Sequence, residues 1–414
     1  MTYKWLHVIG IGDSGVESLL PKYVEQIYSA DVLVGGERQL EFVPDFVGEK
    51  LVLKAPLGKV LDKLKTEHQG QKVVVLASGD PLFYGIGAYL ARMVGQEYVE
   101  VVPFVSSLQL AFARCCENWQ DARLISLHGR SIRGLAQKIN GADKVGLLTD
   151  NVNTPSSIAS YLLRFRFHEY RVFVGENLGS ERERTGWYQL EELVGKQFSP
   201  LAVVVLKRIA GVSPIHFGFG IHDDEFAQRK PVRGMVTNRE VRVLSLSELS
   251  LKPNSVLWDI GACTGSISIE AIHQTPGLQV YAIEKNEEEY ENLLENQARF
   301  RTDFIAVHGR APAGLNEFAD PDAVFIGGSN GELVDLLQIC AERLKKDGRI
   351  VLNAGTIETL YLAQQTLQNL GFHVSVTLVQ TARSKPILNL TRFEGMNPIY
   401  IVSGWKGKGE DNAT

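Results

Sequence analysis

The sequence has few cysteines, no long apolar run and no excess of basic residues. Its 414 residues include only Cys115, Cys116, Cys263 and Cys340, whose spacing fits neither a metal site nor a disulfide framework, so we expect reduced thiols in a cytoplasmic protein. No apolar run reaches the roughly 18 residues of a membrane span, and no signal peptide is expected. The formal net charge of −5 does not indicate the basic surface that binds a phosphate backbone, so we expect no nucleic-acid partner. Without a membrane span, we expect no membrane partner either.

Length and periodicity predict two domains of the α/β class. A chain of 414 residues is long for one hydrophobic core. Short apolar runs alternate with helical patterns in both halves, but the periodicity fades between Lys207 and Glu240, where glycines and prolines interrupt it. We therefore predict a first domain over residues 1–207, a linker over residues 208–230 and a second domain over residues 231–414.

Each half has its own set of predicted strands, rich in Val, Ile and Leu as buried strands are. In the first half they are Trp5–Gly10, Asp31–Val34, Lys72–Ala77, Val99–Val102, Lys144–Leu148, Arg171–Val174 and Leu201–Leu206. In the second half they are Val256–Ile260, Gln279–Glu284, Phe304–His308, Ala323–Ile326, Arg349–Asn353 and Val374–Val379. Helices are predicted over Gly85–Val94, Thr154–Arg164, Glu270–Thr275, Glu287–Phe300, Glu332–Lys345 and Thr356–Gly371.

One strand-to-helix turn in the second half favours a ligand. The strand Val256–Ile260 contains the acid Asp259 and leads into Gly261-Ala262-Cys263-Thr264-Gly265, whose small residues let a ligand approach the backbone. Glu284 ends the next strand, about where a doubly wound fold places an acid on ribose hydroxyls. The turn lacks the third glycine that a dinucleotide-binding dehydrogenase would prefer. If the glycines are considered alone, a tight strand-to-helix turn without a ligand is the alternative interpretation.

Four motifs in the second half resemble the CbiT family, which carries out the decarboxylating methylation of a precorrin at carbon 15. They run from Met235 to Arg242, from Trp258 to Glu270, from Gly309 to Pro312 and from Asp322 to Gly328. The resemblance covers roughly Pro231 to Trp405. It implies a Rossmann-like class I methyltransferase fold that binds S-adenosyl-L-methionine, and a homo-oligomer, possibly a tetramer formed through this half.

The same resemblance implies site residues. Those expected at the cofactor are Thr237, Asp259, Gly261, Ala262, Cys263, Thr264, Gly265, Glu284 and Ala311. Gly327 and Gly328 are expected to close the cleft at a strand end, on the substrate side. Apart from the resemblance, a basic cluster lies just before the cofactor turn and could hold substrate carboxylates; it consists of Arg229, Lys230, Arg233, Arg239 and Arg242. A solvated basic linker is the alternative for this cluster. Cys263 stands where the family usually has glycine.

Four motifs in the first half resemble the tetrapyrrole methylase superfamily and, within it, the CbiE family, which methylates the precorrin at carbon 5. They run from Leu76 to Gly85, from Pro103 to Ala111, from Ser126 to Arg130 and from Leu148 to Asp150. The match spans about Trp5 to Leu206 and implies a tetrapyrrole-methylase fold of two α/β subdomains. The first glycine loop of this superfamily faces substrate, so Gly10, Gly12 and Gly15 are not assigned to the cofactor.

In this half, Gly79, Asp80, Pro81 and Ser107 are expected at the cofactor. Arg130 is a candidate for a substrate carboxylate, because guanidinium groups bind carboxylates bidentately. His128 is either a general base or a structural histidine. No catalytic residue and no metal site is assigned.

Because it carries both resemblances, the chain is similar to the fused, bifunctional form of these two families. This implies a cobalamin-pathway enzyme that methylates precorrin-6B at carbons 5 and 15 and decarboxylates the ring C acetate to give precorrin-8X. An RNA methyltransferase is the main alternative, and the acidic charge balance argues against it. A non-catalytic tetrapyrrole or nucleotide-binding module and a dinucleotide oxidoreductase are further alternatives.

Overall fold

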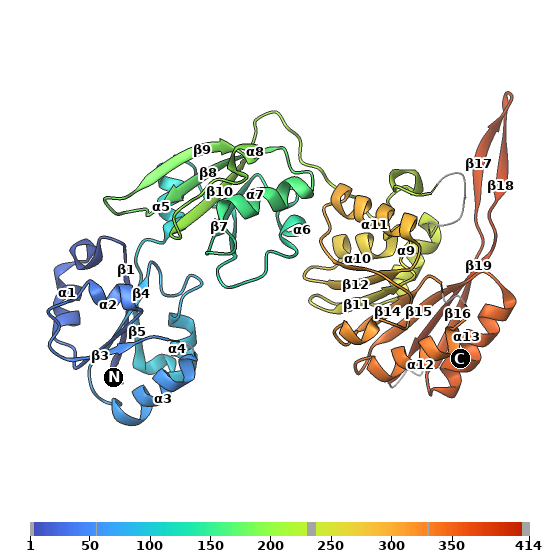
Figure 1. Cartoon of the computed structure of the whole chain (residues 1–414). Helices are drawn as coiled ribbons and strands as arrows, with labels where there is room; N and C mark the ends of the chain where they lie inside the picture. The colour runs from blue at the N-terminus through green and yellow to red at the C-terminus, as the bar shows by residue number, and fades with distance from the viewer. Residues whose placement is uncertain (1–3, 55, 230–236, 329–330, 408–414) are drawn as a thin grey trace. The chain divides into compact units, whose positions relative to one another are not determined.

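The computed structural model describes residues 4–54, 56–229, 237–328 and 331–407 (Figure 1). Two compact units divide the chain. Unit 1 comprises Met1–Ile132, Ala142–Leu163 and Phe167–Pro214, and unit 2 comprises Arg133–Gly141, Arg164–Arg166 and Ile215–Thr414. All four cysteines are free thiols. Among the described residues, none of the helices has both the length and the apolar character needed to cross a bilayer.

Unit 1 begins with a parallel sheet in the order β3-β2-β4-β1-β5. Its strands are β1 (Leu6–Ile11), β2 (Val32–Gly35), β3 (Glu49–Val52), β4 (Val73–Ser78) and β5 (Val99–Val102). The helices between them are α1 (Pro21–Tyr28), α2 (Glu37–Glu41), α3 (Leu57–Glu67) and α4 (Gly87–Val94). Because parallel strands are joined by crossover helices that cover the faces of the sheet, β1 and β4 are almost wholly buried and read as continuous apolar runs.

A second sheet of unit 1 has the order β6-β7-β10-β8-β9 and is mostly antiparallel. Its strands are β6 (Arg123–Ser126), β7 (Lys144–Leu148), β8 (Tyr170–Glu176), β9 (Arg184–Gln189) and β10 (Ala202–Arg208). The helices after β5 are α5 (Ser107–Arg114), α6 (Leu135–Ile139, which belongs to unit 2), α7 (Pro155–Arg164) and α8 (Leu190–Leu193). Two sheets with their own helices confirm the predicted pair of α/β subdomains.

Unit 2 is built on a seven-stranded sheet in the order β13-β12-β11-β14-β15-β19-β16. The strands are β11 (Val256–Ile260), β12 (Gln279–Glu284), β13 (Ile305–His308), β14 (Ala323–Ile326), β15 (Arg349–Ala354), β16 (His373–Val379) and β19 (Ile399–Trp405). The helices are α9 (Arg239–Glu248), α10 (Ser266–Gln274), α11 (Glu287–Arg299), α12 (Leu333–Arg343) and α13 (Ile357–Asn369).

Five of these strands are parallel, and β19 runs antiparallel to both of its neighbours. The two faces of the sheet support separate apolar cores, so that adjacent residues Leu257 and Trp258 of β11 belong to different clusters. The strand order reverses between β11 and β14, and the crevice at the carboxyl ends of such strands is where open α/β sheets bind ligands. The fold thus confirms the predicted Rossmann-like second domain.

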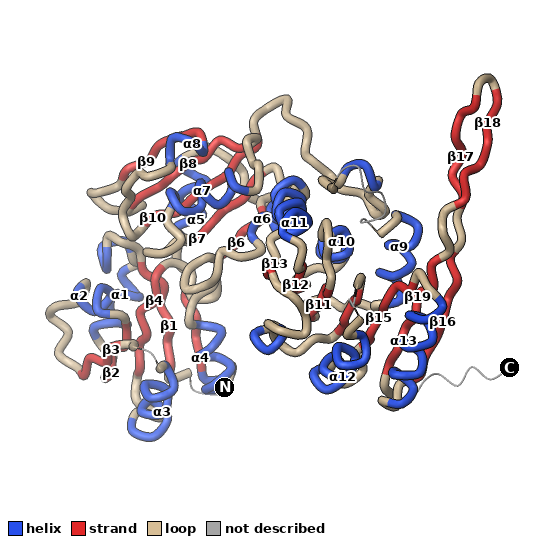
Figure 2. The backbone as a smooth tube through the Cα atoms, turned by 45° about the vertical axis from the view of Figure 1, so that its right-hand side comes forward, coloured by secondary structure: helices blue, strands red, loops and turns tan. Residues whose placement is uncertain are grey.

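A two-stranded arm extends from the sheet of unit 2 (Figures 1 and 2). It consists of β17 (Ala382–Ile387) and β18 (Leu390–Gly395). Its apolar side chains are largely in solvent, with Leu388 at the tip 97% exposed and Phe393 73% exposed. An isolated hairpin has no core of its own, and the sequence analysis does not predict this one.

The predicted helices and strands all correspond to observed elements, although α10 begins at Ser266, well before the predicted Glu270. The strands absent from the prediction are mainly edge strands. β3, β6 and β9 each lie at the edge of a sheet and have mostly exposed or half-buried residues, so they lack the apolar run that marks a buried strand. β19 is also absent from the prediction, although its run Ile-Tyr-Ile-Val is strand-like.

Part of the predicted linker is a folded segment of unit 2. Ile221 and Phe226 are 6% and 3% exposed and belong to the core under α10 and α11, on either side of a short 3-10 turn at Asp223–Glu225. The periodicity fades here because, apart from this 3-10 turn, residues 215–229 form no helix or strand. The predicted domain limits at residues 207 and 231 stay predictions, and residues 230–236 lie outside the described part of the chain.

A fragment of unit 2 that begins at residue 215 should be more stable than one that begins at residue 231. The longer fragment keeps Ile221 and Phe226, and burying each side chain is worth about 1.5–3 kcal/mol. We expect a difference of about 3 kcal/mol or more in the free energy of unfolding, measured by urea denaturation. Phe226→Ala in the longer fragment should remove part of the gain. Equal stability of the two fragments would show that the segment contributes nothing to the core.

Candidate functional site

Unit 1 encloses a cavity of about 590 Å³ that is lined by residues from both of its sheets. Five residues singled out from the sequence line it, namely Gly79, Asp80, Ser107, His128 and Arg130. Pro81, the remaining predicted residue, is the next residue after Asp80 but is not part of the lining. The cavity therefore brings together the candidate cofactor residues and the candidate substrate residue of this half.

Glycines at the ends of β1 and β4 allow a close backbone approach in unit 1. A Cβ atom on Gly10 would lie 2.1 Å from the carbonyl oxygen of Gly79, so these loops can meet only without that side chain. Gly79 has a φ of +61°, and its N–H donates to the carbonyl of Ile11 at 3.0 Å. The Oδ1 atom of Asp80 accepts the N–H of Leu82 at 2.9 Å, which fixes the turn. Gly10 is thus required for packing.

The N-terminus of α5 faces the same cavity. Ser106 caps the helix, because its Oγ accepts the N–H of Gln109 at 3.2 Å while the Gln109 side chain accepts the Ser106 N–H at 2.8 Å. Ser106 and Ser107 both line the cavity. The positive end of the helix therefore lies beside the Gly79–Asp80 turn.

Arg38 is a cavity residue that the sequence analysis missed. Its Nη1 donates to Oδ1 of Asp13 at 3.0 Å and its Nη2 to Oγ of Ser78 at 3.3 Å, and all three residues line the cavity. Its position just after the glycine pair that ends β2 is the only signal in the sequence. Arg130 lies over the ring of Tyr84, with its guanidinium carbon 5.4 Å from the ring centroid. Two guanidinium groups thus line this cavity.

In unit 2 the predicted turn lies at the reversal of strand order. Gly261 and Gly265 have φ values of +71° and +74°. A Cβ on Gly261 would lie 2.9 Å from the backbone nitrogen of Gly328, and a Cβ on Gly327 would lie 2.8 Å from the carbonyl oxygen of Gly261. The turn after β11 and the end of β14 therefore touch backbone to backbone, and the N–H of Ala262 donates to Ile283 of β12 at 3.1 Å. Three strand ends meet here, as the sequence predicts.

Glu284 lies at the end of β12 and is held by two backbone groups. Its Oε2 accepts the N–H of Cys263 at 2.9 Å and its Oε1 accepts the N–H of Asn286 at 2.8 Å. The residue is 7% exposed. Each carboxylate oxygen has a second lone pair that can accept from a ligand hydroxyl.

Asp259 is buried beneath the same turn. Its Oδ2 accepts from Oγ of Ser268 at 2.5 Å and from the Ser268 N–H at 3.2 Å, while its Oδ1 has no hydrogen-bond partner among the residues that the structure describes. Burial raises the pKa of this carboxyl group to about 6. An uncompensated carboxylate of this kind favours a cationic ligand nearby.

Cys263 adopts a φ of +50°, a conformation that glycine adopts more readily. Its thiol donates to the buried carboxylate of Glu289 at 3.4 Å, and burial raises the pKa of the thiol well above its usual range. A thiol that stays protonated is a poor nucleophile. The adjacent Thr264 is buried, and its carbonyl accepts from Asn296 at 2.9 Å. Ala311, the predicted residue beyond β13, precedes a cis proline.

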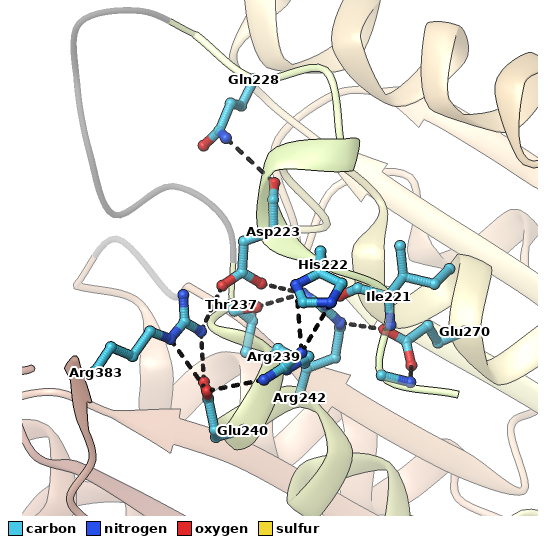
Figure 3. Close-up of polar contacts among 11 residues, drawn as sticks. Ile221, His222, Asp223, Gln228, Thr237, Arg239, Glu240, Arg242, Glu270 and Arg383 are labelled. Carbon is cyan, nitrogen blue, oxygen red and sulfur yellow. Dashed lines mark hydrogen bonds and ion pairs between the residues drawn. The ribbon is translucent and has the colours of Figure 1, made fainter. Parts of the chain in front are cut away.

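Arg242 corrects an expectation from the sequence (Figure 3). Its side chain is completely buried, and its Nε donates to Oε1 of Glu270 at 2.5 Å. Its Nη1 donates to Oδ1 of Asp223 at 3.1 Å and to the carbonyl of Thr237 at 2.6 Å, and its Nη2 donates to the carbonyl of Ile221. The guanidinium is therefore unavailable to a substrate, and its role is to hold the backbone around Thr237.

The neighbouring basic residues differ from Arg242. Arg239 is partly exposed, and its Nη1 lies 3.2 Å from Nε2 of His222, so its substrate role stays a prediction. Arg383, at the base of the arm, donates to both Asp223 and Glu240 and was not predicted (Figure 3). Lys230 and Arg233 of the predicted basic cluster lie outside the described residues.

Comparison with known proteins gives matches to both halves. A family described as tetrapyrrole (corrin/porphyrin) methylases matches residues 5–194, and a precorrin methyltransferase domain matches residues 231–406. A precorrin-6Y C(5,15)-methyltransferase [decarboxylating] from Sinorhizobium sp is 33% identical over 409 residues, which covers 97% of each chain. A cobalt-precorrin-7 C(5)-methyltransferase from Salmonella typhimurium is 37% identical and covers 49% of this chain and 98% of its own.

Among solved structures, a precorrin-6y C5,15-methyltransferase from Geobacter metallireducens is 41% identical. It matches with a TM-score of 0.44 and covers 45% of this chain and 98% of its own.

Replacing Arg242 by Met should destabilise unit 2 strongly, because it leaves the buried Glu270 carboxylate without its counter-charge. Removing one partner of a buried pair costs about 3–5 kcal/mol in general. The double variant Arg242→Met/Glu270→Gln should lose less, because it removes the uncompensated charge, and the single amide oxygen of Gln can still accept from one of the two backbone N–H groups, those of Gly220 and Ile221, that Glu270 holds. Chemical denaturation of the full chain measures both, with the unfolding of unit 1 as the internal reference. A single variant as stable as the wild type would contradict the assignment.

Proposed function

Since the chain belongs to the precorrin-6Y C(5,15)-methyltransferase (decarboxylating) family, we propose that it is a bifunctional S-adenosyl-L-methionine-dependent methyltransferase of cobalamin biosynthesis. Unit 1 methylates a precorrin at carbon 5, and unit 2 methylates it at carbon 15 and removes the carboxyl group of the ring C acetate. The near full-length match to a relative with this name carries the proposal. Two different candidate ligand sites, one in each unit, support it.

The geometry of unit 2 suits S-adenosylmethionine. Glu284 has free lone pairs for the two ribose hydroxyls, and the Gly261–Gly265 turn leaves its backbone open to the ligand. The buried carboxyl group of Asp259 suits the cationic methionine end. In unit 1 the Gly79–Asp80 turn and the N-terminus of α5 at Ser107 form the corresponding site.

S-adenosylmethionine supplies an activated methyl group when bound. The protein's contribution is then to hold donor and acceptor in line, and positioning of this kind can supply on the order of 7–11 kcal/mol of a barrier. In unit 1 the guanidinium groups of Arg38 and Arg130 are placed to bind the carboxylates of the tetrapyrrole. In unit 2 the partly exposed Arg239 is the candidate for this role.

Decarboxylation requires an electron acceptor, and the substrate provides one. Methylation at carbon 15 leaves the conjugated ring system as an iminium-like cation. The acetate on ring C then loses carbon dioxide, and the electron pair of the broken carbon–carbon bond neutralises the cation. No separate electron sink on the protein is needed.

The acidic charge balance argues against an RNA methyltransferase, the alternative from the sequence.

Association of copies also stays a prediction, and the exposed apolar side chains of the β17–β18 arm are a suitable surface for it. Sedimentation of Phe393→Lys beside the wild type would test that surface, and an unchanged oligomer would exclude it.

The division of labour between the units is tested by product masses. The wild type incubated with precorrin-6B and S-adenosylmethionine should add two methyl groups and release one carbon dioxide. Gly261→Arg should abolish methylation at carbon 15 and carbon dioxide release, because any side chain at Gly261 meets the backbone of Gly328. Asp80→Arg should remove only the methyl at carbon 5. Carbon dioxide release that persists in Gly261→Arg, with cofactor binding to unit 2 lost, would falsify the coupling.

Cofactor binding to unit 2 should strengthen as pH rises through about 6. Burial favours the protonated form of Asp259, so a cationic ligand beside it must drive off a proton at low pH. The dissociation constant should be about tenfold larger at pH 5 than at pH 7, because one pH unit below a pKa leaves about a tenth of the group ionised. Calorimetry in the Asp80→Arg background isolates this site. Asp259→Asn should bind more weakly at pH 7 and show a flat profile, and a flat wild-type profile would exclude the role.

A further inference from the structure

The cavity of unit 1 contains three side chains that can accept a proton, namely Asp13, Asp80 and His128. The carboxylate of Asp13 accepts from Arg38, and that of Asp80 accepts from the backbone of Leu82. Both carboxylates thus serve as acceptors within the framework of the cavity. Histidine is the side chain that most often acts as a general base in enzymes, which makes His128 the group of interest.

The tautomer of His128 is set by its contact with the protein. Its Nδ1 lies 3.2 Å from the carbonyl oxygen of Thr149. Because a carbonyl only accepts, Nδ1 must carry the hydrogen, and the neutral ring then has its lone pair on Nε2. The structure shows no hydrogen-bond partner for Nε2 among the residues that it describes. Thr149 is itself fixed, since its hydroxyl donates to the carbonyl of Ala202 at 2.6 Å.

The loop that carries His128 is held at several points by the turn after β7. The N–H of Gly129 donates to Oδ2 of Asp150 at 2.7 Å. The Nδ2 of Asn153 donates to the carbonyls of Leu127 at 2.8 Å and of Arg130 at 2.9 Å. Asn153 is buried, and its own N–H donates to Asp150 at 2.6 Å. A loop fixed on both sides of a side chain gives the preorganisation that proton transfer needs.

The reaction at carbon 5 produces a proton that must be accepted. A meso carbon carries one hydrogen, and a methyl group added to it leaves the carbon with four substituents and the ring with a positive charge. The carbon–sulfur bond breaks and sulfur keeps its electron pair. The carbon–hydrogen bond then breaks, its electron pair restores the conjugated double bond, and the proton leaves. Atoms and charge balance with a base as the only further reactant.

We propose that Nε2 of His128 is the general base that removes this proton, an inference that rests on the function proposed for unit 1. Arg130 lies two residues further along the same fixed loop and holds a substrate carboxylate. The same loop then orients the tetrapyrrole ring through Arg130 and positions the imidazole of His128 beside it. Tyr84, over which Arg130 lies, has a φ of +55°, and strained backbone at a bulky residue is typical of functional sites.

The test uses the full chain and reads both methylations in one reaction. His128→Gln and His128→Ala are compared with the wild type and with His168→Gln, a control histidine of unit 1 outside the cavity lining that pairs with Glu191. The substrate is precorrin with hydrogen or deuterium at carbon 5, in a single turnover. Methylation at carbon 15 and carbon dioxide release serve as the internal standard, and cofactor binding to unit 1 is measured by calorimetry.

We expect the rate of carbon 5 methylation to fall by roughly 10²–10⁴-fold in both His128 variants, the usual contribution of a general base. Proton removal then limits the rate, so a primary deuterium isotope effect should appear in His128→Gln. Added imidazole should restore part of the rate in His128→Ala. The carbon 15 reaction, cofactor binding and the His168 control should be unchanged.

Two results would overturn the proposal. One is an unchanged carbon 5 rate in His128→Gln. The other is a lower rate without an isotope effect and without rescue by imidazole, which would assign His128 to positioning alone. A wild type that fails to methylate carbon 5 would instead contradict the function proposed for unit 1, so the two failures are distinguishable.

Discussion

The close approach of two backbone turns at the carboxyl ends of parallel strands is the constraint on which both candidate sites depend. In unit 1 the Gly10 loop meets Gly79, and in unit 2 the Gly261 turn meets Gly327 and Gly328. A methyl group at either contact would force the turns apart. The absence of a side chain brings loops from separate strands together, and the functional side chains beside them, such as Asp80 and Glu284, take their places from that contact.

The turn in unit 2 also concentrates buried polar atoms that the protein leaves unsatisfied. Within the described part of the chain, Oδ1 of Asp259, Oγ1 of Thr264 and Oε1 of Glu289 are all buried without a hydrogen-bond partner. Each such atom costs about 1–3 kcal/mol in a folded protein. A polar ligand bound at this turn could form hydrogen bonds with these atoms and so offset the cost. Arg242 and Glu270, by contrast, have hydrogen-bond partners within the protein and stabilise unit 2.

Elements and residues whose positions depend on local sequence pattern could be predicted, whereas those whose roles depend on tertiary contacts could not. The buried strands, such as β4 and β11, have continuous apolar runs, while the edge strands β3 and β9 do not. Glu284 could be placed because a strand end fixes it. The substrate role predicted for Arg242 was wrong, because the sequence around Arg242 does not show that its side chain pairs with Glu270 in another helix. Arg38 was missed because its importance comes from the cavity that surrounds it.

In the function proposed here, the two halves differ in how a methylated ring regains neutrality, and the two candidate sites fit that difference. At carbon 15 the electron pair released with carbon dioxide neutralises the cation, so this step needs no base. In accordance with this, Cys263 and Glu284 at the turn of unit 2 are engaged by protein hydrogen bonds. At carbon 5 no carboxyl group leaves, and only loss of a proton restores the conjugation. An imidazole with a free nitrogen in the cavity of unit 1 supplies the acceptor that the chemistry of that half requires and that of the other does not.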